Sequence, residues 1–206
     1  MGHYFLNDDN LKSEIKEFKV IISNKEFIFK TDNGVFSKGE LDYGTYLLLE
    51  TILKENIFGH VLDLGCGYGP IGIIISKLKD CKVTMVDVNN RAIHLTKMNI
   101  KENKCLNTVA LNSDGFSNLE QKFDFIITNP PIRVGKEKLY SLFIEARKYL
   151  NELGVIYLVI RKEQGAKSFI KDMSNYYQVD VLNKSKGFCI ISLKCCWLLK
   201  KIVLLI

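Results

Sequence analysis

Asn129, Pro130 and Pro131 follow the apolar run 123–128 and form the motif whose residue types best suit chemistry. Proline has a fixed φ and no N–H, and it keeps the preceding residue extended, so this exit from a strand is stiff. The Asn129 side-chain oxygen and the Pro130 carbonyl can accept both hydrogens of one planar amino group, which distinguishes NH2 from OH or CH. The motif therefore predicts a clamp for an amine on a flat ring or for an amide, although Asn-Pro also opens ordinary turns.

The segment "DLGCGYGPIG", residues 63–72, predicts a loop that binds a nucleotide-like ligand. It carries three closely spaced glycines: Gly65, Gly67 and Gly69. Glycines let the backbone turn sharply and approach a ligand, and the start of the following helix favours negative charge. Asp87 ends the next strand, where a carboxylate can accept two ribose hydroxyls. The alternative role of Asp87 is the N-cap of a helix that begins near Asn89.

The elements that must position these residues follow from hydrophobic periodicity. Five short, nearly continuous apolar runs are typical of strands buried on both faces of a parallel sheet: 60–65, 82–87, 108–114, 123–129 and 154–160. Four stretches between or after them have helical character: 72–80, 89–105, 136–153 and 162–177. This alternation predicts an open, Rossmann-like α/β sheet that binds ligands at the carboxyl ends of its strands.

Both ends of the chain add antiparallel strands. Runs 177–185 and 187–194 are too close for a crossover helix, so they predict a C-terminal hairpin that completes a mostly parallel, seven-stranded sheet. Residues 17–31, interrupted at 24–25, predict an N-terminal β-hairpin extension, and 41–56 has helical spacing.

Length and composition favour one domain, which we assign to 1–194 with an N-terminal extension over about 1–56. The formal net charge of +6 favours a polyanionic partner. The six cysteines form no CxxC pair and have no His at ligand spacing, and the amino terminus lacks the pattern of a signal peptide. We therefore expect a reduced, cytoplasmic protein without a metal site.

The hydrophobic tail 195–206, "CCWLLKKIVLLI", needs a separate interpretation. Twelve residues interrupted by two lysines are too few for a helix that spans a bilayer. The tail could pack on the sheet edge, contact a membrane surface or a partner, or reflect an altered reading frame.

Two ligands suit the glycine loop, a nicotinamide dinucleotide and S-adenosylmethionine. The loop contains a GxGxxG match, but the chain shows neither the Tyr and Lys pair nor the separate substrate domain usual in dehydrogenases of this size. "DLGCGYG", led by Asp63, instead resembles motif I of the class I S-adenosylmethionine-dependent methyltransferases. The resemblance implies that the loop wraps the methionine part of the cofactor, that Asp87 takes the ribose and that Asp114 reads the adenine amino group. Cys66 is then a small packing residue.

The Asn-Pro-Pro motif resembles that of amino-nitrogen methyltransferases. Together with "GVFSKGELDYGTYLLLET", "VLDLGCGYGPIG" and "VDVNNRAIHLTKMN", it narrows the resemblance to the small-domain methyltransferases related to ribosomal RNA small subunit methyltransferase C. The similarity runs from about residue 3 to Lys194. It implies a single catalytic domain that methylates guanine N2 in 16S rRNA of the small ribosomal subunit, with the nitrogen lone pair aimed at a methyl sulfonium.

The resemblance also implies a set of site residues. The catalytic positions are Asn129, Pro130, Pro131 and Ile132. The positions for the cofactor are Asp42, Gly44, Asp63, Gly65, Cys66, Gly67, Asp87, Asp114 and Asn129. The positions for the substrate are Phe36, Arg133, Lys136, Arg161 and Lys162. The four basic residues follow the clamp or the fifth strand, so they should flank the pocket where phosphates lie.

Several alternatives stay open. The clamp also fits the adenine amino group or a protein glutamine amide, and a catalytically silent RNA-binding module could keep the same fold. Phe36 could be ordinary core, and Asp42 could be the N-cap of the following helix. Ile132 stands where many relatives carry an aromatic residue that stacks on the base, so aliphatic packing or an aromatic ring from elsewhere must replace it. Monomer and dimer are both compatible with the sequence.

Overall fold

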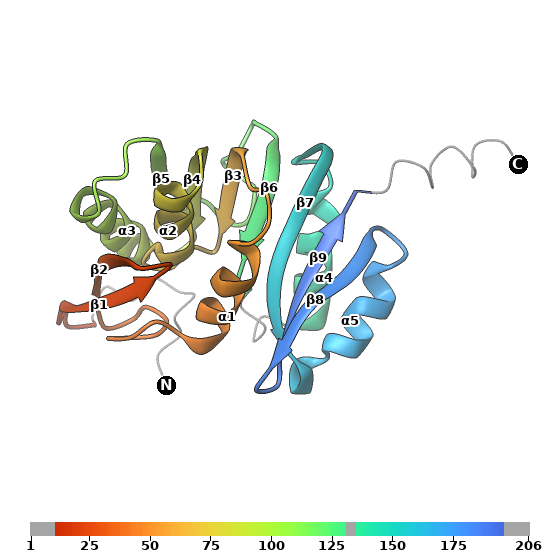
Figure 1. Cartoon of the computed structure of the whole chain (residues 1–206), viewed down its shortest axis with the longest axis horizontal. Helices are drawn as coiled ribbons and strands as arrows, with labels where there is room; N and C mark the ends of the chain where they lie inside the picture. Colours follow the sequence, from red (N-terminus) through yellow and green to blue (C-terminus); the bar gives the residue numbers. More distant parts are fainter. Residues whose placement is uncertain (1–10, 131–134, 196–206) are drawn as a thin grey trace, which may run out of the picture.

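A seven-stranded sheet forms the centre of the molecule in the computed structural model, which describes residues 11–130 and 135–195. The strand order is β5-β4-β3-β6-β7-β9-β8, and β9 alone runs opposite to the other six strands (Figure 1). The strands are β3 (Gly59–Leu64), β4 (Cys81–Asp87), β5 (Thr108–Asn112), β6 (Phe123–Thr128), β7 (Leu150–Arg161), β8 (Gln178–Ser185) and β9 (Phe188–Lys194).

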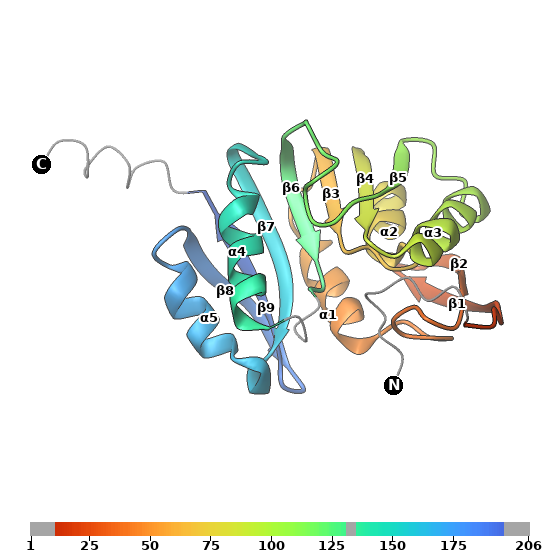
Figure 2. The ribbon, with the colours of Figure 1, turned by 180° about the vertical axis from the view of Figure 1, so that it is seen from behind.

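Helices cover both faces of the sheet, as Figures 1 and 2 show from opposite sides. One face carries α1 (Tyr43–Ile52), α2 (Pro70–Leu78), α3 (Asn90–Glu102) and the separate hairpin of β1 (Lys16–Ile22) and β2 (Lys25–Thr31). The other face carries α4 (Lys136–Ala146) and α5 (Ala166–Met173), the latter preceded by the 3-10 turn η2 (Lys162–Gln164). Side chains alternate along each strand, so Val61 joins the first core and Leu62 the second.

Two amides at the end of α3 bind the β1–β2 hairpin: Asn99 in the last turn of the helix and Asn103, its C-cap. Asn103 accepts from the N–H of Ile28 at 3.1 Å and donates to its carbonyl at 2.7 Å. Asn99 makes the same pair of hydrogen bonds with Lys30, at 2.8 and 3.0 Å. The two side chains therefore satisfy the free edge of β2 as a third strand would.

The predicted fold class is confirmed, including the N-terminal hairpin and the C-terminal antiparallel pair, which forms one edge of the sheet. Several boundaries were wrong, including the following two. The first turn is Ser23–Asn24, with both φ angles positive, rather than 24–25. Residues 150–153 belong to β7 and not to a helix, because Leu150 is buried and pairs with Phe123 of β6. The helical spacing of apolar residues continues into 150–153, although the chain already pairs with the sheet there.

None of the helices in the described ranges is long and apolar enough to cross a membrane. The predicted tail lies outside the described residues from 196 onward, so its three interpretations remain predictions.

Candidate functional site

The candidate site lies where the direction of strand succession reverses, between β3 and β6. These strands are parallel neighbours with Asp63 opposite Ile127, and the Thr128 hydroxyl donates to the Leu64 carbonyl at 2.7 Å. The glycine loop that leaves β3 and the Asn129 exit of β6 therefore start side by side. Open α/β sheets bind ligands at such a reversal, outside the carboxyl ends of the strands.

The glycine loop is held by backbone hydrogen bonds and has room above it. The N–H groups of Gly65 and Cys66 both donate to the Val86 carbonyl at 2.9 Å. Gly65 and Gly67 have φ angles of 72° and 58°, a region that favours glycine, and a Cβ on either would meet no atom within 4 Å. The loop thus presents bare backbone to an open space, as close approach of a ligand requires.

Asp87 links the end of β4 to the glycine loop. One carboxylate oxygen accepts from Gly67 N at 2.8 Å, and the other accepts from Asn89 N at 2.9 Å. Burial raises the pKa of this carboxyl, while the two N–H donors act in the opposite direction. Asn89 is the N-cap of α3, so the alternative that Asp87 caps this helix was wrong.

Asp63 is completely buried beneath the loop. Its Oδ2 accepts from Gly72 N at 2.8 Å, whereas its Oδ1 has no hydrogen-bond partner among the described residues. Burial, with a further contribution from the charge of Asp87, raises the pKa of this carboxyl to about 7. An unsatisfied buried oxygen of this kind is suited to a polar group or a cation that arrives with a ligand.

Asn129 is held by two side chains from the start of α1. Its Nδ2 donates to Asp42 Oδ2 and to Thr45 Oγ1, each at 3.0 Å. Asp42 is also the N-cap of α1, because the same oxygen accepts from Thr45 N at 2.9 Å. Because this oxygen already acts as an acceptor for Thr45 N, the end of the amide that faces it is the nitrogen, which leaves Oδ1 as the acceptor for a substrate. The alternative role of Asp42 as an N-cap is thus confirmed, and the same carboxylate also accepts from Asn129.

Of the remaining predicted clamp residues, only Pro130 lies within the described residues. Pro130 is buried directly after Asn129. Pro131, Ile132 and Arg133 lie outside the described residues, so their roles stay predictions.

Other predicted positions lie around the same end of the sheet. Phe36 is 48% exposed in the loop after β2, so the core alternative was wrong. Gly44 is buried against Phe188, and a Cβ there would come within 2.8 Å of that ring. Asp114 is exposed just after β5. The Cys66 thiol is buried and its pKa is raised well above the usual value, mainly by burial, which agrees with a packing role.

The basic residues lie in two different environments. Arg161 and Lys162 are exposed at the carboxyl end of β7. Lys136, the first residue of α4, instead pairs with Asp172 of α5 at 3.3 Å and lies 4.9 Å from the centre of the Tyr140 ring. The hydrogen bond to Asp172 raises the pKa of Lys136. The structure therefore directs this lysine toward α5 rather than toward Asn129.

Three supporting residues were missed by sequence reasoning. Thr45 holds Asn129, Thr96 donates to the Gly67 carbonyl at 2.8 Å, and Asn99 donates to the Tyr68 carbonyl at 2.9 Å. Thr96 and Asn99 are fully buried polar residues three positions apart on α3. A polar pair at this spacing on the apolar face of an amphipathic helix is the signal that could have found them.

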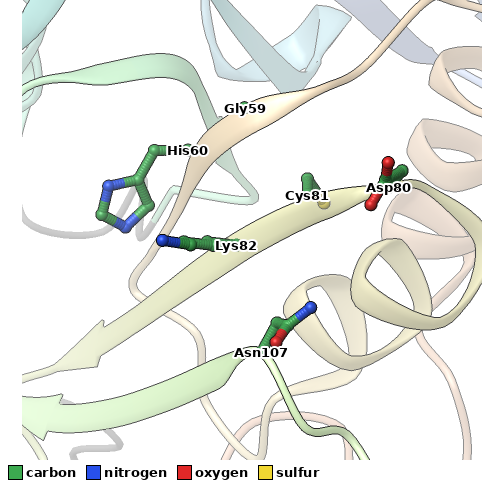
Figure 3. Close-up of a pocket in the computed structure, with 6 residues that line it drawn as sticks. All are labelled: Gly59, His60, Asp80, Cys81, Lys82 and Asn107. Atoms are coloured by element: carbon green, nitrogen blue, oxygen red, sulfur yellow. The ribbon is translucent and has the colours of Figure 1, made fainter.

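A separate hollow of about 460 Å³ lies at the opposite, amino-terminal ends of β3 and β4 (Figure 3). Its lining residues are Gly59, His60, Asp80, Cys81, Lys82 and Asn107. None of the predicted site residues contributes to it, so we place the functional site at the carboxyl ends of the strands.

The domain has the features of a class I methyltransferase: its strand order, its glycine loop and Asp87 at the end of β4. The comparisons with known proteins agree, and the chain belongs to the methyltransferase small domain family, whose model matches residues 26–192.

Among its relatives, the chain is 40% identical to the uncharacterized protein YbxB of Bacillus subtilis over 93% of this chain and 98% of that protein. It is 50% identical to ribosomal RNA small subunit methyltransferase C of Mannheimia succiniciproducens over 56% of this chain and 34% of that protein. The matched part is 45% of the Haemophilus influenzae (strain PittEE) methyltransferase C, so the chain spans less than half of these methyltransferases.

A solved structure with the same fold is the 16S rRNA N2 guanine methyltransferase RsmC of T. thermophilus in complex with AdoMet and guanosine. The TM-score is 0.80 at 25% identity, over 90% of this chain and 52% of that one. The predicted fold and family are thereby confirmed, and the predicted cofactor agrees with the AdoMet bound to that enzyme.

Proposed function

We propose that this protein is an S-adenosylmethionine-dependent N-methyltransferase that acts on guanine N2 in 16S rRNA of the small ribosomal subunit. The observation that carries the proposal is the orientation of the Asn129 amide. Asp42 and Thr45 occupy its nitrogen, so its oxygen is left to accept a hydrogen from a substrate amino group next to an open glycine loop. The related proteins named as RsmC act on this kind of substrate.

The residues at the carboxyl end of β3 fit the cofactor. Gly65 and Gly67 leave the space in which backbone can cradle it, and the two oxygens of Asp87 keep acceptor capacity for ribose hydroxyls beside their backbone donors. Asp63 Oδ1 lacks a partner and could receive a polar or cationic group through the loop. The further proposed contacts are Asp42, Gly44, Cys66, Asp114 and Asn129.

S-adenosylmethionine, when bound, supplies an electrophilic methyl group. Asn129 Oδ1 and the Pro130 carbonyl would accept the two hydrogens of the guanine amino group, which draws the nitrogen lone pair out of conjugation with the ring. The amino group then needs no deprotonation before it attacks, so orientation and electrostatics supply the rate without a strong base. The proton that the methylated nitrogen must lose passes to water after the transfer. The hydrogen bonds from Asn129 to Asp42 and Thr45 hold the amide in place before the substrate arrives.

The direct test is methyl transfer from labelled S-adenosylmethionine to three acceptors: naked 16S rRNA, assembled small subunits and ribosomal protein. We expect label in RNA, and digestion to nucleosides should yield N2-methylguanosine. Label in adenine or in a glutamine amide would overturn the guanine assignment and retain the clamp. Cofactor binding without transfer to any of the acceptors would overturn the catalytic proposal.

A further inference from the structure

The turn between β8 and β9 holds a lysine in an uncommon backbone conformation. Lys186 and Gly187 form the two-residue turn, with φ angles of 45° and 79°. Positive φ at both positions is the pattern of a type I′ hairpin turn, which favours Asn, Asp or Gly at the first position. A lysine there adopts a sparsely populated conformation, and such residues cluster at functional sites.

The Lys186 side chain covers an aromatic ring. Its Nζ lies 4.6 Å from the centre of the Tyr43 ring, and the Tyr43 hydroxyl is 2.9 Å from the Ser185 hydroxyl. The neighbouring Phe188 ring is 5.7 Å from the Tyr43 ring and is covered by the Arg161 guanidinium at 4.5 Å. We refer to Tyr43, Arg161, Lys186 and Phe188 as the aromatic–cation cluster.

The cluster lies next to the groups that hold Asn129. Phe188 packs on Gly44, which lies between Tyr43 and Thr45 at the start of α1, and Asp42 directly precedes Tyr43. In the sheet, β6 lies between β3 on one side and β7 with β9 on the other. The cluster is therefore on the opposite side of Asn129 from the glycine loop, and Figure 1 shows α1 and the β8–β9 turn at the same end of the sheet.

Structural reasons alone do not account for this arrangement. A cation over a ring at an exposed site contributes only weakly to stability, and Lys186 and Arg161 are both exposed. Among the described residues, Arg161 pairs with one carboxylate, that of the exposed Glu163 at 3.2 Å. A ring whose face is covered only by an exposed cation can instead stack on a base, and the cation can then contact a phosphate.

We infer that the aromatic–cation cluster binds the nucleotide that flanks the methylated one in a single-stranded segment of RNA. The inference rests on the proposed function and extends it to a second nucleotide. A base stacks on Tyr43 or Phe188, while Lys186 and Arg161 contact the adjoining phosphates. The cluster also provides aromatic rings near Asn129 in a chain that has Ile132 at the sequence position where many relatives carry an aromatic residue.

The test measures the affinity of a fluorescently labelled single-stranded RNA oligonucleotide by anisotropy. Lys186→Asn removes the cation and places at this turn a residue that suits it, so folding is preserved. We expect the Kd for RNA to rise about five- to tenfold and the salt dependence of binding to lose about one counterion. Phe188→Leu, which removes a ring without changing charge, should raise the Kd about tenfold and leave the salt dependence unchanged.

Lys184→Asn is the matched control. Lys184 lies opposite Cys189, whose side chain joins the core under α4 and α5, so strand alternation directs it to the other face of the hairpin. The Lys184→Asn variant should keep the RNA affinity within about twofold of the wild-type value. Equal losses for Lys184→Asn and Lys186→Asn would show general electrostatic attraction only and would overturn the inference.

Failure of the inference can be distinguished from failure of the proposed function. Unchanged RNA affinity in Lys186→Asn and Phe188→Leu, or no RNA binding by the wild type, overturns the flanking-nucleotide site whatever the protein methylates. RNA binding that depends on the cluster, without methyl transfer to guanine, overturns the proposed function and leaves the site standing.

Discussion

On the β3–β4 side of Asn129 the candidate site presents mainly backbone to a ligand, whereas on the β7–β9 side it presents side chains. The glycine loop exposes the backbone of Gly65 and Gly67, and the side chains that hold it, such as Asp87 and Thr96, lie behind this backbone. Asn129 and the aromatic–cation cluster depend instead on hydrogen bonds and ring contacts between side chains far apart in sequence. Backbone contacts suit a ligand that never changes, while side-chain contacts can be varied to select a substrate.

The largest effect should come from the side-chain half. Asn129→Ala removes the oriented acceptor, so kcat should fall about 100- to 1000-fold, corresponding to about 3 to 4 kcal/mol of transition-state stabilisation. Cofactor affinity should stay near the wild-type value, because the proposed cofactor contacts lie chiefly in the glycine loop and Asp87. Methyl transfer and calorimetric titration with S-adenosylmethionine check the two parts. A stable, fully active variant would mean that the Asn-Pro-Pro segment is only a turn.

The next prediction uses the hydrogen bond between Asn129 and Asp42. Asn129→Asp replaces the donor with a second carboxylate at hydrogen-bond distance from Asp42, and like charges so close disfavour ionisation of both groups. We expect lower activity and a lower melting temperature. Adding Asp42→Asn removes the like charge and supplies an amide that can donate to the new carboxylate, so the double variant should recover about 1 to 3 kcal/mol of coupling. The recovery is incomplete, because the atom that donates can no longer accept from Thr45 N as Asp42 Oδ2 does.

A double-mutant cycle of melting temperature and kcat measures this coupling. Additive losses in the double variant would show that Asp42 does not orient Asn129.

On the glycine-loop side, we expect a substitution to weaken cofactor binding, whereas Asn129→Ala should mainly reduce turnover. Asp87→Ala removes acceptors for the ribose and the tie to Gly67, and loss of such a charge-assisted hydrogen bond costs about 1.5 to 3 kcal/mol. Affinity for S-adenosylmethionine should fall at least about tenfold. Asp80→Ala is the matched control, because Asp80 is a carboxylate beside the opposite end of β4. Equal cofactor affinity in both variants would contradict the assignment of Asp87.

The smallest predicted effect concerns Asp63 and the pH dependence of stability. Its folded pKa of about 7 lies above the ordinary value of 3.8, so the folded state binds the proton more tightly than the unfolded state. This contribution is fully present below pH 3.8 and is lost as pH rises through 7. The free energy of unfolding should therefore fall by about 1 to 3 kcal/mol between pH 5 and pH 8 because of this group.

Asp63→Asn should remove that slope while other titrations remain. Urea unfolding at pH 5 and at pH 8 provides the measurement. An unchanged pH dependence in the variant would show that the carboxyl is ionised in the folded protein throughout this range.

The sequence by itself determined the elements and the glycine loop. Apolar runs and helical spacing located the strands and helices, because strand and helix periodicities arise from neighbours within about four residues. The positive φ angles of Gly65 and Gly67 and the place of Asp87 at the end of a strand are local features of the same kind. Sequence reasoning failed at 150–153, where pairing with β6 outweighed a helical pattern.

Only the tertiary structure decided how the substrate side is assembled. The direction of the Asn129 amide depends on Asp42, 87 positions earlier, and the aromatic–cation cluster joins α1 to β7 and β9. These residues meet because β6, β7 and β9 are neighbours in the sheet and α1 packs across them. Such contacts are set by the packing free energy of the whole core, which no short stretch of sequence contains.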